Sequence, residues 1–377
     1  MAVYLDNSAT TKPCREAADA VKFMIEENYG NPSSLHAPGI EAAKSLISAR
    51  ESVARALGCE KDEIYFTSGA TEANNLALFG AAEAKKRAGN RIVTTAIEHE
   101  SVVAAADELE QQGFEVIKLL PDKHGNICAA DIAQAINEKT ILVSVMYINN
   151  EIGSVLPVDK IKKIIEMKKA PALFHTDCVQ ALGKIKFSPK KLGADLVSVT
   201  AHKIHGPKGV GALYIKKGTR ILPRTFGGEQ ERRMRPGTEA SPLIAGFGAA
   251  AAALPDVKAQ GEAVKKLNMY LRELLLEIDG IKFNSDESAS PYILNVSIPT
   301  FMRSQTIVQE LSSKYEVYVS NGSACARGKK SHVLSAMRLS DDTADKSIRI
   351  SFSRCNTLHD CEICAAAIKD LTEKHPR

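Results

Sequence analysis

Short runs of aliphatic and β-branched residues alternate, over most of the first 215 residues, with segments whose apolar residues recur every three or four positions. The runs predict buried strands and the longer period predicts helices. Regular strand–helix alternation indicates an α/β fold with a mainly parallel sheet covered by helices on both faces. The predicted strands are 63–66, 91–96, 115–119, 141–148, 173–176, 196–200 and 210–215, and the predicted helices cover 40–57 and 132–136 or begin at residues 72, 101 and 158.

The pattern changes after a helical segment that begins at Ser241. Pro255 interrupts this segment, and helix resumes toward Ile278. Predicted strands at 292–298, 317–320 and 348–352 then mix with predicted helices at 305–314, 332–337 and 358–372. We therefore predict a large domain of residues 15–255 and a smaller α+β domain formed by residues 1–14 and 256–377.

Composition narrows the class of protein. The chain has 377 residues, 44% of them hydrophobic and 25% charged, with a net charge of +4. No basic run is interleaved with aromatic residues, so a nucleic-acid partner is not expected. The N-terminal residues have no basic region followed by an apolar run, and no apolar stretch is long enough to span a bilayer. We expect a cytoplasmic protein without a membrane partner.

Cysteine spacing gives little sign of a metal site. The eight cysteines are scattered, which favours reduced thiols. Cys361 and Cys364 form a lone CxxC, with Cys355 and His359 nearby. A four-ligand zinc site needs more partners at suitable spacing, so we predict helical thiols and no metal.

Lys203 lies between two predicted strands, in the segment LVSVTAHKIHGPKGVGALYI at residues 196–215. A lysine at the end of a buried strand can lose its charge when water is excluded, and its amine then becomes a nucleophile. The position suits a covalent bond to a carbonyl cofactor. A lysine in a solvated turn is the alternative interpretation.

Residues 67–75, TSGATEANN, follow one strand and open a helix. Small residues let backbone N–H groups approach an anion, the helix N-terminus favours negative charge, and Thr71 adds a hydroxyl. The pattern predicts a phosphate site, and a plain helix cap is the alternative.

Polar side chains also follow three other strands. Asp177 could keep a pyridinium nitrogen protonated, which makes such a ring an electron sink, and Gln180 could reach the ring oxygen. His99 can stack on an aromatic ring and move protons near neutral pH. Asn150 can bind a cofactor or substrate oxygen. Helix caps and turns explain the same residues without a ligand.

Three segments in the second half carry further candidates. Cys325 has basic neighbours in NGSACARGKK, residues 321–330, which favour a reactive thiolate. Arg349 lies inside an apolar strand and needs a partner, either a substrate carboxylate or a structural acid. Thr238 ends a glycine-rich polar loop, 227–239, that is either exposed or reaches a phosphate in a neighbouring subunit.

Taken in order, these segments resemble the cysteine desulfurases, fold type I enzymes that use pyridoxal phosphate. Any one motif is weak, but the ordered set is specific and spans nearly the whole chain. The motifs are LDNSATT at 5–11, TSGATE at 67–72, EH at 98–99, NNEIG at 149–153, HTDCVQ at 175–180, AHKIHGPKG at 201–209, RPGTE at 235–239, NGSAC at 321–325 and RIS at 349–351.

The resemblance implies a role for each matching residue. Lys203 would bond to the cofactor carbonyl, and Cys325 would accept the sulfur. His99 would stack on the ring and assist proton transfer, Asp177 would pair with the pyridine nitrogen, and Gln180 would contact the ring oxygen.

The remaining roles concern phosphate and carboxylate groups. The resemblance implies that the cofactor phosphate is held by Ala70, Thr71, Thr200 and His202, with Thr238 from the other subunit. Asn150, which also belongs to the cofactor site, would orient the substrate carboxylate with Arg349 and Asn7.

The implied reaction converts L-cysteine to L-alanine and leaves the sulfur as a persulfide on Cys325. The implied partners are L-cysteine, a sulfur-acceptor protein of iron–sulfur cluster assembly or another thio-cofactor route, and a second copy of the chain in a homodimer. Segment 325–333 is shorter and more basic than in housekeeping members and the chain ends earlier, so the acceptor stays open. Selenocysteine lyase, cysteine sulfinate desulfinase and aminotransferase activities are alternatives, as is a sulfur carrier without turnover.

Overall fold

The structure is a computed structural model that describes residues 2–322 and 331–376. At its centre is a seven-stranded sheet with the order β2-β8-β7-β6-β5-β3-β4. Strands β4, β3, β5, β6 and β7 pair in parallel, whereas β8 is antiparallel to both of its neighbours. The predicted α/β fold with a mainly parallel sheet is confirmed. The strands are β2 (Ile64–Thr67), β3 (Arg91–Thr95), β4 (Glu115–Leu119), β5 (Thr140–Ser144), β6 (Leu173–Asp177), β7 (Leu196–Thr200) and β8 (Gly211–Ile215).

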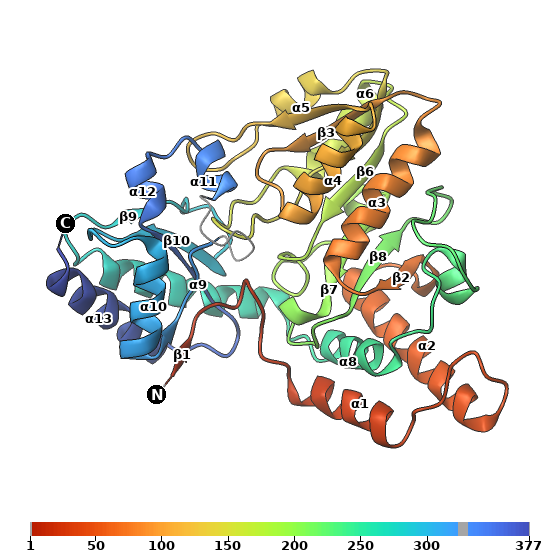
Figure 1. Cartoon of the computed structure of the whole chain (residues 1–377), viewed down its shortest axis with the longest axis horizontal. Coiled ribbons are helices and arrows are strands. Elements are labelled where there is room, and N and C mark those ends of the chain that lie inside the picture. The colour runs from red at the N-terminus through yellow and green to blue at the C-terminus, as the bar shows by residue number, and fades with distance from the viewer. Residues whose placement is uncertain (1, 323–330, 377) are drawn as a thin grey trace.

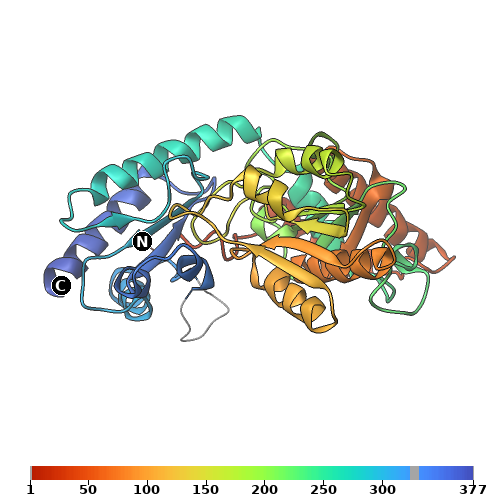
Figure 2. The ribbon, with the colours of Figure 1, turned by 90° about the horizontal axis from the view of Figure 1, so that it is seen from above.

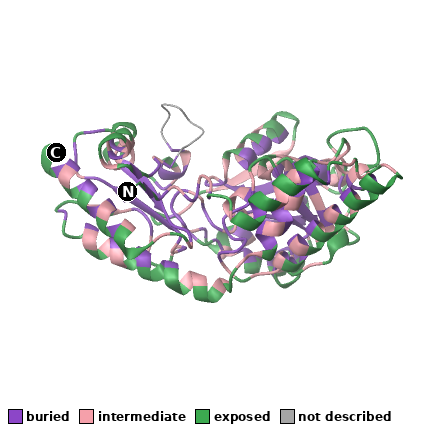
Figure 3. Ribbon diagram, turned by 90° about the horizontal axis from the view of Figure 1, so that it is seen from below, coloured by how far each residue is buried: buried purple, intermediate pink, exposed green. Residues whose placement is uncertain are grey.

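Helices cover both faces of this sheet, because successive apolar residues of one strand point to opposite faces. Ile92 of β3 packs in one core with helices α3 and α4, whereas the next residue, Val93, packs in another with α5 and α6. Figures 1 and 2 show the helices around the sheet, and Figure 3 shows buried strands behind helices with exposed outer surfaces. These helices are α2 (Ala37–Leu57), α3 (Ala70–Lys85), α4 (Glu100–Gln111), α5 (Ala129–Ala135), α6 (Val158–Met167), α7 (Pro189–Leu192) and α8 (Ser241–Ala252).

A second, antiparallel sheet has the order β12-β10-β9 and lies in the other lobe of Figure 1. The N-terminal strand β1 (Val3–Tyr4) pairs in parallel with β11 (Val317–Tyr318), so the first residues lie in this lobe. The predicted bounds of the two domains stay a prediction. The remaining elements here are β9 (Lys282–Phe283), β10 (Ile293–Ser297), β12 (Ser347–Ser351), α9 (Val257–Leu275), α10 (Ser304–Tyr315), α11 (His332–Ala336), α12 (Asp341–Asp345) and α13 (Leu358–Lys374).

Some elements differ from those predicted. Helix α1 (Arg15–Glu26), which packs on α8, was not predicted, and only Ala17 and Met24 of it are buried, so its apolar stripe is narrow. Strand β5 ends at Ser144 rather than at residue 148, because the next residues turn toward an isolated bridge between Ile148 and Val155.

The C-terminal CxxC lies on α13 with both thiols buried. Burial raises the pKa of the Cys361 thiol to about 12, and that of Cys364 is raised further. Within residues 2–322 and 331–376, no three His, Cys, Asp or Glu side chains are grouped so that they could hold a metal ion. In the same residues, no helix is long and apolar enough to cross a membrane.

Candidate functional site

A cavity of about 510 Å³ lies where the carboxyl ends of β3, β5, β6 and β7 meet. Polar residues that follow these strands converge there, as expected for a parallel sheet whose ligand site lies at its carboxyl edge. The structure therefore brings together most of the residues that were singled out in the sequence. The predicted site residues that line the cavity are Ala70, Thr71, His99, Asn150, Asp177, Gln180, Thr200, His202, Lys203 and Arg349.

Two predicted site residues that the structure describes, Asn7 and Thr238, do not line the cavity. Asn7 is buried beside it, where its side-chain nitrogen donates to the Ser351 carbonyl at 2.9 Å. Thr238 lines a separate hollow formed by its own loop together with Glu72. Cys325 lies outside the described residues.

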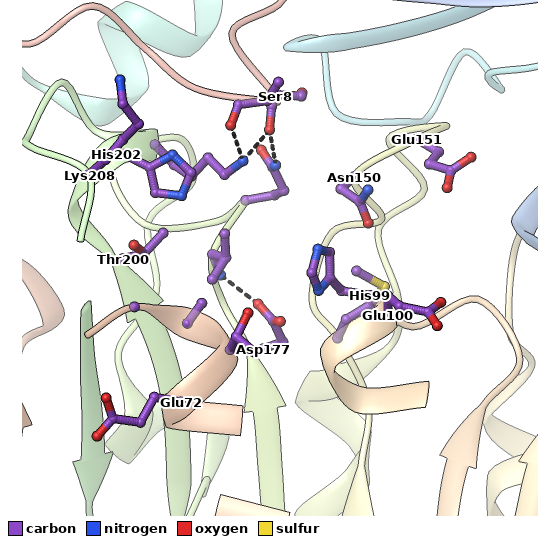
Figure 4. A pocket seen from close by; sticks show the side chains of 18 of the residues that line it. Ser8, Glu72, His99, Glu100, Asn150, Glu151, Asp177, Thr200, His202 and Lys208 are labelled. Carbon is purple, nitrogen blue, oxygen red and sulfur yellow. Dashed lines mark hydrogen bonds between the residues drawn. The ribbon is translucent and has the colours of Figure 1, made fainter. Parts of the chain in front are cut away.

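Lys203 is placed by a short 3-10 helix, η2 (Ala201–Lys203), directly after β7. Its amine donates to the backbone carbonyls of Ser8 and Ala9, at 2.5 and 2.7 Å. Thr11 binds the His202 carbonyl through both its N–H and its hydroxyl. The N-terminal segment thus crosses from the second lobe and holds the Lys203 amine at the cavity, as Figure 4 shows around Ser8.

His99 caps the N-terminus of α4. Its Nδ1 accepts from the backbone N–H of Ser101 at 3.2 Å, so in the neutral ring the proton lies on Nε2. Burial lowers the pKa of His99, the Asp177 carboxylate opposes this shift, and Lys203 adds to it. The Nε2–H of a neutral His99 is not used by the helix cap, so it can donate or relay a proton in the cavity. Figure 4 shows both His99 and Asp177 at this cavity.

Two polar residues that sequence reasoning did not assign connect His99 to Asp177. The side-chain nitrogen of Asn74 donates to Asp177 Oδ2 at 2.8 Å and to Ser101 Oγ at 2.9 Å. Ser101 Oγ in turn lies 2.8 Å from His99 Nδ1. Asn74 is part of the TSGATEANN motif, and Ser101 lies two residues after His99. Their role could have been inferred only from the faces of α3 and α4 on which they lie.

The N-terminus of α3 forms an anion cradle at one end of the cavity. Gly69 precedes it with φ 156° and ψ 179°, a conformation open almost only to glycine. Gly211 of β8 lies so close that an added Cβ would be 2.7 Å from the Gly69 backbone. Because the backbone has no intruding side chains here, its N–H groups are accessible to a phosphate.

Two further predicted phosphate ligands flank this cradle. The Thr200 hydroxyl donates to the Val210 carbonyl at 3.0 Å, and His202 Nδ1 lies 3.3 Å from Thr10 Oγ1. Burial and the neighbouring cations Lys203 and Lys208 lower the pKa of His202 to about 3. A neutral His202 that accepts from Thr10 at Nδ1 carries its proton on Nε2, where it can donate to an anion.

Arg349 reaches the cavity from β12 and is buried. Its Nη2 pairs with Asp6 Oδ1 at 2.8 Å, and its Nη1 donates to the Asn150 carbonyl at 3.0 Å. Arg349 Nε and Asn150 Oδ1 are both buried and have no hydrogen-bond partner among the described residues. Unpaired buried polar atoms are costly, so they indicate that a ligand with polar groups completes this end of the cavity.

Two acidic residues support the site, Glu98 from behind the cavity and Glu151 from its wall. Glu98 is fully buried and accepts from Thr95 Oγ1 at 2.8 Å and from the Met146 N–H at 2.9 Å. Burial raises the pKa of Glu98 to about 8. Glu151 accepts from Ser331 Oγ at 2.5 Å, where Ser331 caps α11.

Comparison with known proteins gives consistent matches over the whole chain. The family model described as Aminotransferase class-V matches residues 3–363. The chain is 39% identical to a cysteine desulfurase IscS of Methanosarcina thermophila, with 99% of this chain and 92% of the relative covered. It is 40% identical to a cysteine desulfurase IscS of Clostridium botulinum, with 99% and 96% covered.

Solved structures agree with these sequence matches. A NifS-like protein superposes with a TM-score of 0.93 at 37% identity, covering 99% of this chain and all of the other. A structure described as SspA in complex with cysteine gives a TM-score of 0.83 at 32% identity, covering 94% of this chain and all of the other.

Proposed function

This chain belongs to the aminotransferase class-V family and, within it, to the cysteine desulfurases, and from that premise we propose how its cavity works. The protein converts L-cysteine to L-alanine and holds the released sulfur as a persulfide on Cys325. The observation that carries this proposal is the convergence of Lys203, His99, Asp177 and Arg349, from separate segments, on one cavity.

We assign pyridoxal phosphate as the cofactor, and the donor set fits it. The cradle before α3 and His202 suit its phosphate, and the buried Asp177 carboxylate suits a protonated ring nitrogen. When bound, the cofactor takes up the electron pair released at the substrate α-carbon. The Asp177 carboxylate is held in place because it accepts from Asn74 at 2.8 Å and from the Val179 N–H at 2.9 Å.

The residues of the chain then divide the remaining work. Arg349, with Asn150, orients the substrate carboxylate through charge-assisted hydrogen bonds. The Lys203 amine removes the α-proton, and His99 moves protons at the same cavity. The Cys325 thiolate attacks the substrate sulfur, the bond between that sulfur and the β-carbon breaks, and a sulfur–sulfur bond forms on Cys325. A proton added at the β-carbon and one returned to the α-carbon give L-alanine.

A homodimer is part of the proposal. Thr238 does not line the cavity of its own chain, so a phosphate contact from Thr238 requires a second copy. Large apolar side chains are exposed on α1, on the segment that follows it and directly before the Thr238 loop, which suits a covered surface. They include Phe23, Tyr29, Leu35 and Phe226. A cytoplasmic location and a sulfur-acceptor protein, such as an iron–sulfur scaffold, complete the proposal.

Alanine release from L-cysteine, with added pyridoxal phosphate and a reductant, tests the proposal. The wild-type protein should release alanine, and Cys325→Ser should bind the cofactor without turnover. Cys128→Ser, which changes an exposed cysteine away from the cavity, is the matched control and should be as active as the wild type. Alanine formation by Cys325→Ser would refute the role of Cys325, and none from the wild type would refute the proposed reaction.

A further inference from the structure

Lys184 is a buried lysine just behind the cavity and is not one of its lining residues. Only 7% of its surface is exposed, and its Nζ lies 2.6 Å from Gln180 Oε1. It also lies 5.6 Å from the centre of the Tyr292 ring, which favours a cation. Burying a lysine is costly unless its amine has a good partner, and Gln180 is that partner.

The nitrogen of the Gln180 amide also has a partner, and this partner is a hydrogen-bond acceptor. Gln180 Nε2 donates to the Ser8 carbonyl at 3.0 Å. A carbonyl can only accept, so the Ser8 contact requires the amide nitrogen to face Ser8. The amide oxygen then faces Lys184, whose amine donates to it. The Ser8 carbonyl thus selects one of the two orientations that a glutamine amide can adopt, and the hydrogen bond from Lys184 stabilises it.

This orientation determines which group the amide presents to the cavity. Nε2 carries two hydrogens, and one of them is used by the Ser8 carbonyl. Gln180 lines the cavity, so the second N–H is the group that it can offer to a ligand. The Ser8 carbonyl also accepts from Lys203 Nζ, which keeps that carbonyl from turning away.

We propose that Lys184 is a positioning residue that holds the Gln180 amide with its nitrogen toward the cavity, so that this point of the site is an obligate hydrogen-bond donor. A ligand oxygen placed here must accept a hydrogen bond from Gln180 Nε2, as an ionised ring oxygen does. A protonated ring hydroxyl would find no acceptor at this point for its own hydrogen. The orientation of the amide follows from the chain alone, and the consequence for the ring oxygen rests on the proposed function.

A second, small cavity of about 20 Å³ is lined by Lys184 together with Gln260 and Tyr292. Gln260 Oε1 is buried there with no partner among the described residues. A space of this size holds one water, which could bridge Gln260 and Lys184. The amine can thus be satisfied at that cavity while its bond to Gln180 stays intact.

The orientation is tested first without any cofactor. In protein labelled with ¹⁵N at glutamine, the side-chain signals that disappear in Gln180→Ala belong to Gln180. We expect its amide hydrogens to exchange at least about threefold faster in Lys184→Met than in the wild type, because loss of the Lys184 hydrogen bond leaves the amide oxygen unheld and lets the amide turn. Lys186→Met, which changes an exposed neighbouring lysine, should leave the rate unchanged. Unchanged exchange in a folded Lys184→Met would overturn the proposal.

The consequence for the ligand is tested with pyridoxal phosphate. In Lys184→Met the dissociation constant should rise about 2- to 10-fold, and the pH midpoint of the cofactor absorbance change should rise. In a Gln180→Ala background the same substitution should have no further effect, since Lys184 acts through Gln180. An equal effect in that background would overturn the positioning role.

Two controls keep the outcomes separate. Lys184→Gln, whose amide can turn to the unpartnered Gln260 oxygen, replaces Lys184→Met if thermal unfolding shows that the latter does not fold. A wild-type protein that binds no pyridoxal phosphate would refute the proposed function, and the exchange experiment would still decide whether Lys184 orients Gln180.

Discussion

Asn74 joins the carboxylate of Asp177 to the hydroxyl of Ser101, because one side-chain nitrogen donates to both, at 2.8 and 2.9 Å. Through Ser101 the same residue supports His99, so a carboxylate beneath the cavity and an imidazole beside it share one hydrogen-bonded chain. Asn74 is fully buried and its geometry is fixed by α3. Its replacement should therefore disturb both groups together.

Asn74→Ala should lower kcat for alanine formation about 10-fold or more, with a smaller change in KM. A hydrogen bond to a charged group contributes about 1.5–3 kcal/mol, and 1.4 kcal/mol is one factor of ten. Asn74→Asp should be worse, because it places a second carboxylate against Asp177. Steady-state kinetics measure both variants, and wild-type kcat in Asn74→Asp would show that the donor is not required.

Lys203→Ala should lose the covalent bond to the cofactor and lower alanine formation at least about 100-fold, which is what loss of a positioned proton acceptor costs. Mass spectrometry after borohydride reduction should find pyridoxal phosphate attached to the wild-type chain and not to the variant. Lys186→Ala is the control. Covalent cofactor in Lys203→Ala would assign the bond to another lysine.

Glu98→Gln should become progressively more stable than the wild type between pH 5 and pH 8. In the folded protein Glu98 keeps its proton up to about pH 8, whereas in the unfolded chain it loses it near 4.5. Between these values the folded state binds more protons, so the free energy of unfolding of the wild type falls as the pH rises, by at most about 1.4 kcal/mol per pH unit.

Glu98→Gln is neutral across this pH range, so its free energy of unfolding does not fall in this way. Urea unfolding of both proteins at several pH values measures the difference. Glu108→Gln changes an exposed residue on the following helix. Its free energy of unfolding should change with pH as that of the wild type does. A constant difference between Glu98→Gln and the wild type across this range would mean that Glu98 is already ionised in the folded protein.

Glu231→Gln should destabilise the protein by about 3 kcal/mol, because it breaks a buried ion pair and leaves Arg50 uncompensated. Glu231 binds both terminal nitrogens of Arg50, at 2.6 and 2.8 Å, and accepts from the Phe66 N–H at 3.0 Å. It anchors the loop that carries Thr238.

That loop is held in an unfavourable backbone conformation. Glu231, Arg232 and Arg233 have consecutive positive φ values of 44°, 55° and 67°. Residues with side chains rarely adopt this region, so the anchor at Glu231 offsets local strain. Glu229→Gln, which alters an exposed partner of Arg233, should leave the unfolding midpoint unchanged. Equal midpoints for the two variants would refute the anchoring role.

Sequence patterns predicted the sheet well because its strands are buried on both faces and appear as apolar runs. Strand β7, fully buried, was predicted with its observed bounds, and the polar residues after β3, β5, β6 and β7 converge as parallel pairing requires. The pattern could not predict contacts between segments that are far apart in the chain. Ser8 touching Lys203, Asp6 pairing with Arg349 and Asn74 bridging two strand ends depend on the folded chain.

The shielded thiols of the fold have a consequence for a protein that handles reactive sulfur. A persulfide passes its outer sulfur to a neighbouring thiolate, and a thiol must ionise to accept it. Burial raises the pKa of Cys59 and of Cys361 to about 12 and that of Cys178 well above its usual value, so at neutral pH these groups stay protonated and inert. These three thiols are thus poor acceptors of sulfur, so among the described residues the exposed thiols that sulfur could reach within the chain are Cys128 and Cys355.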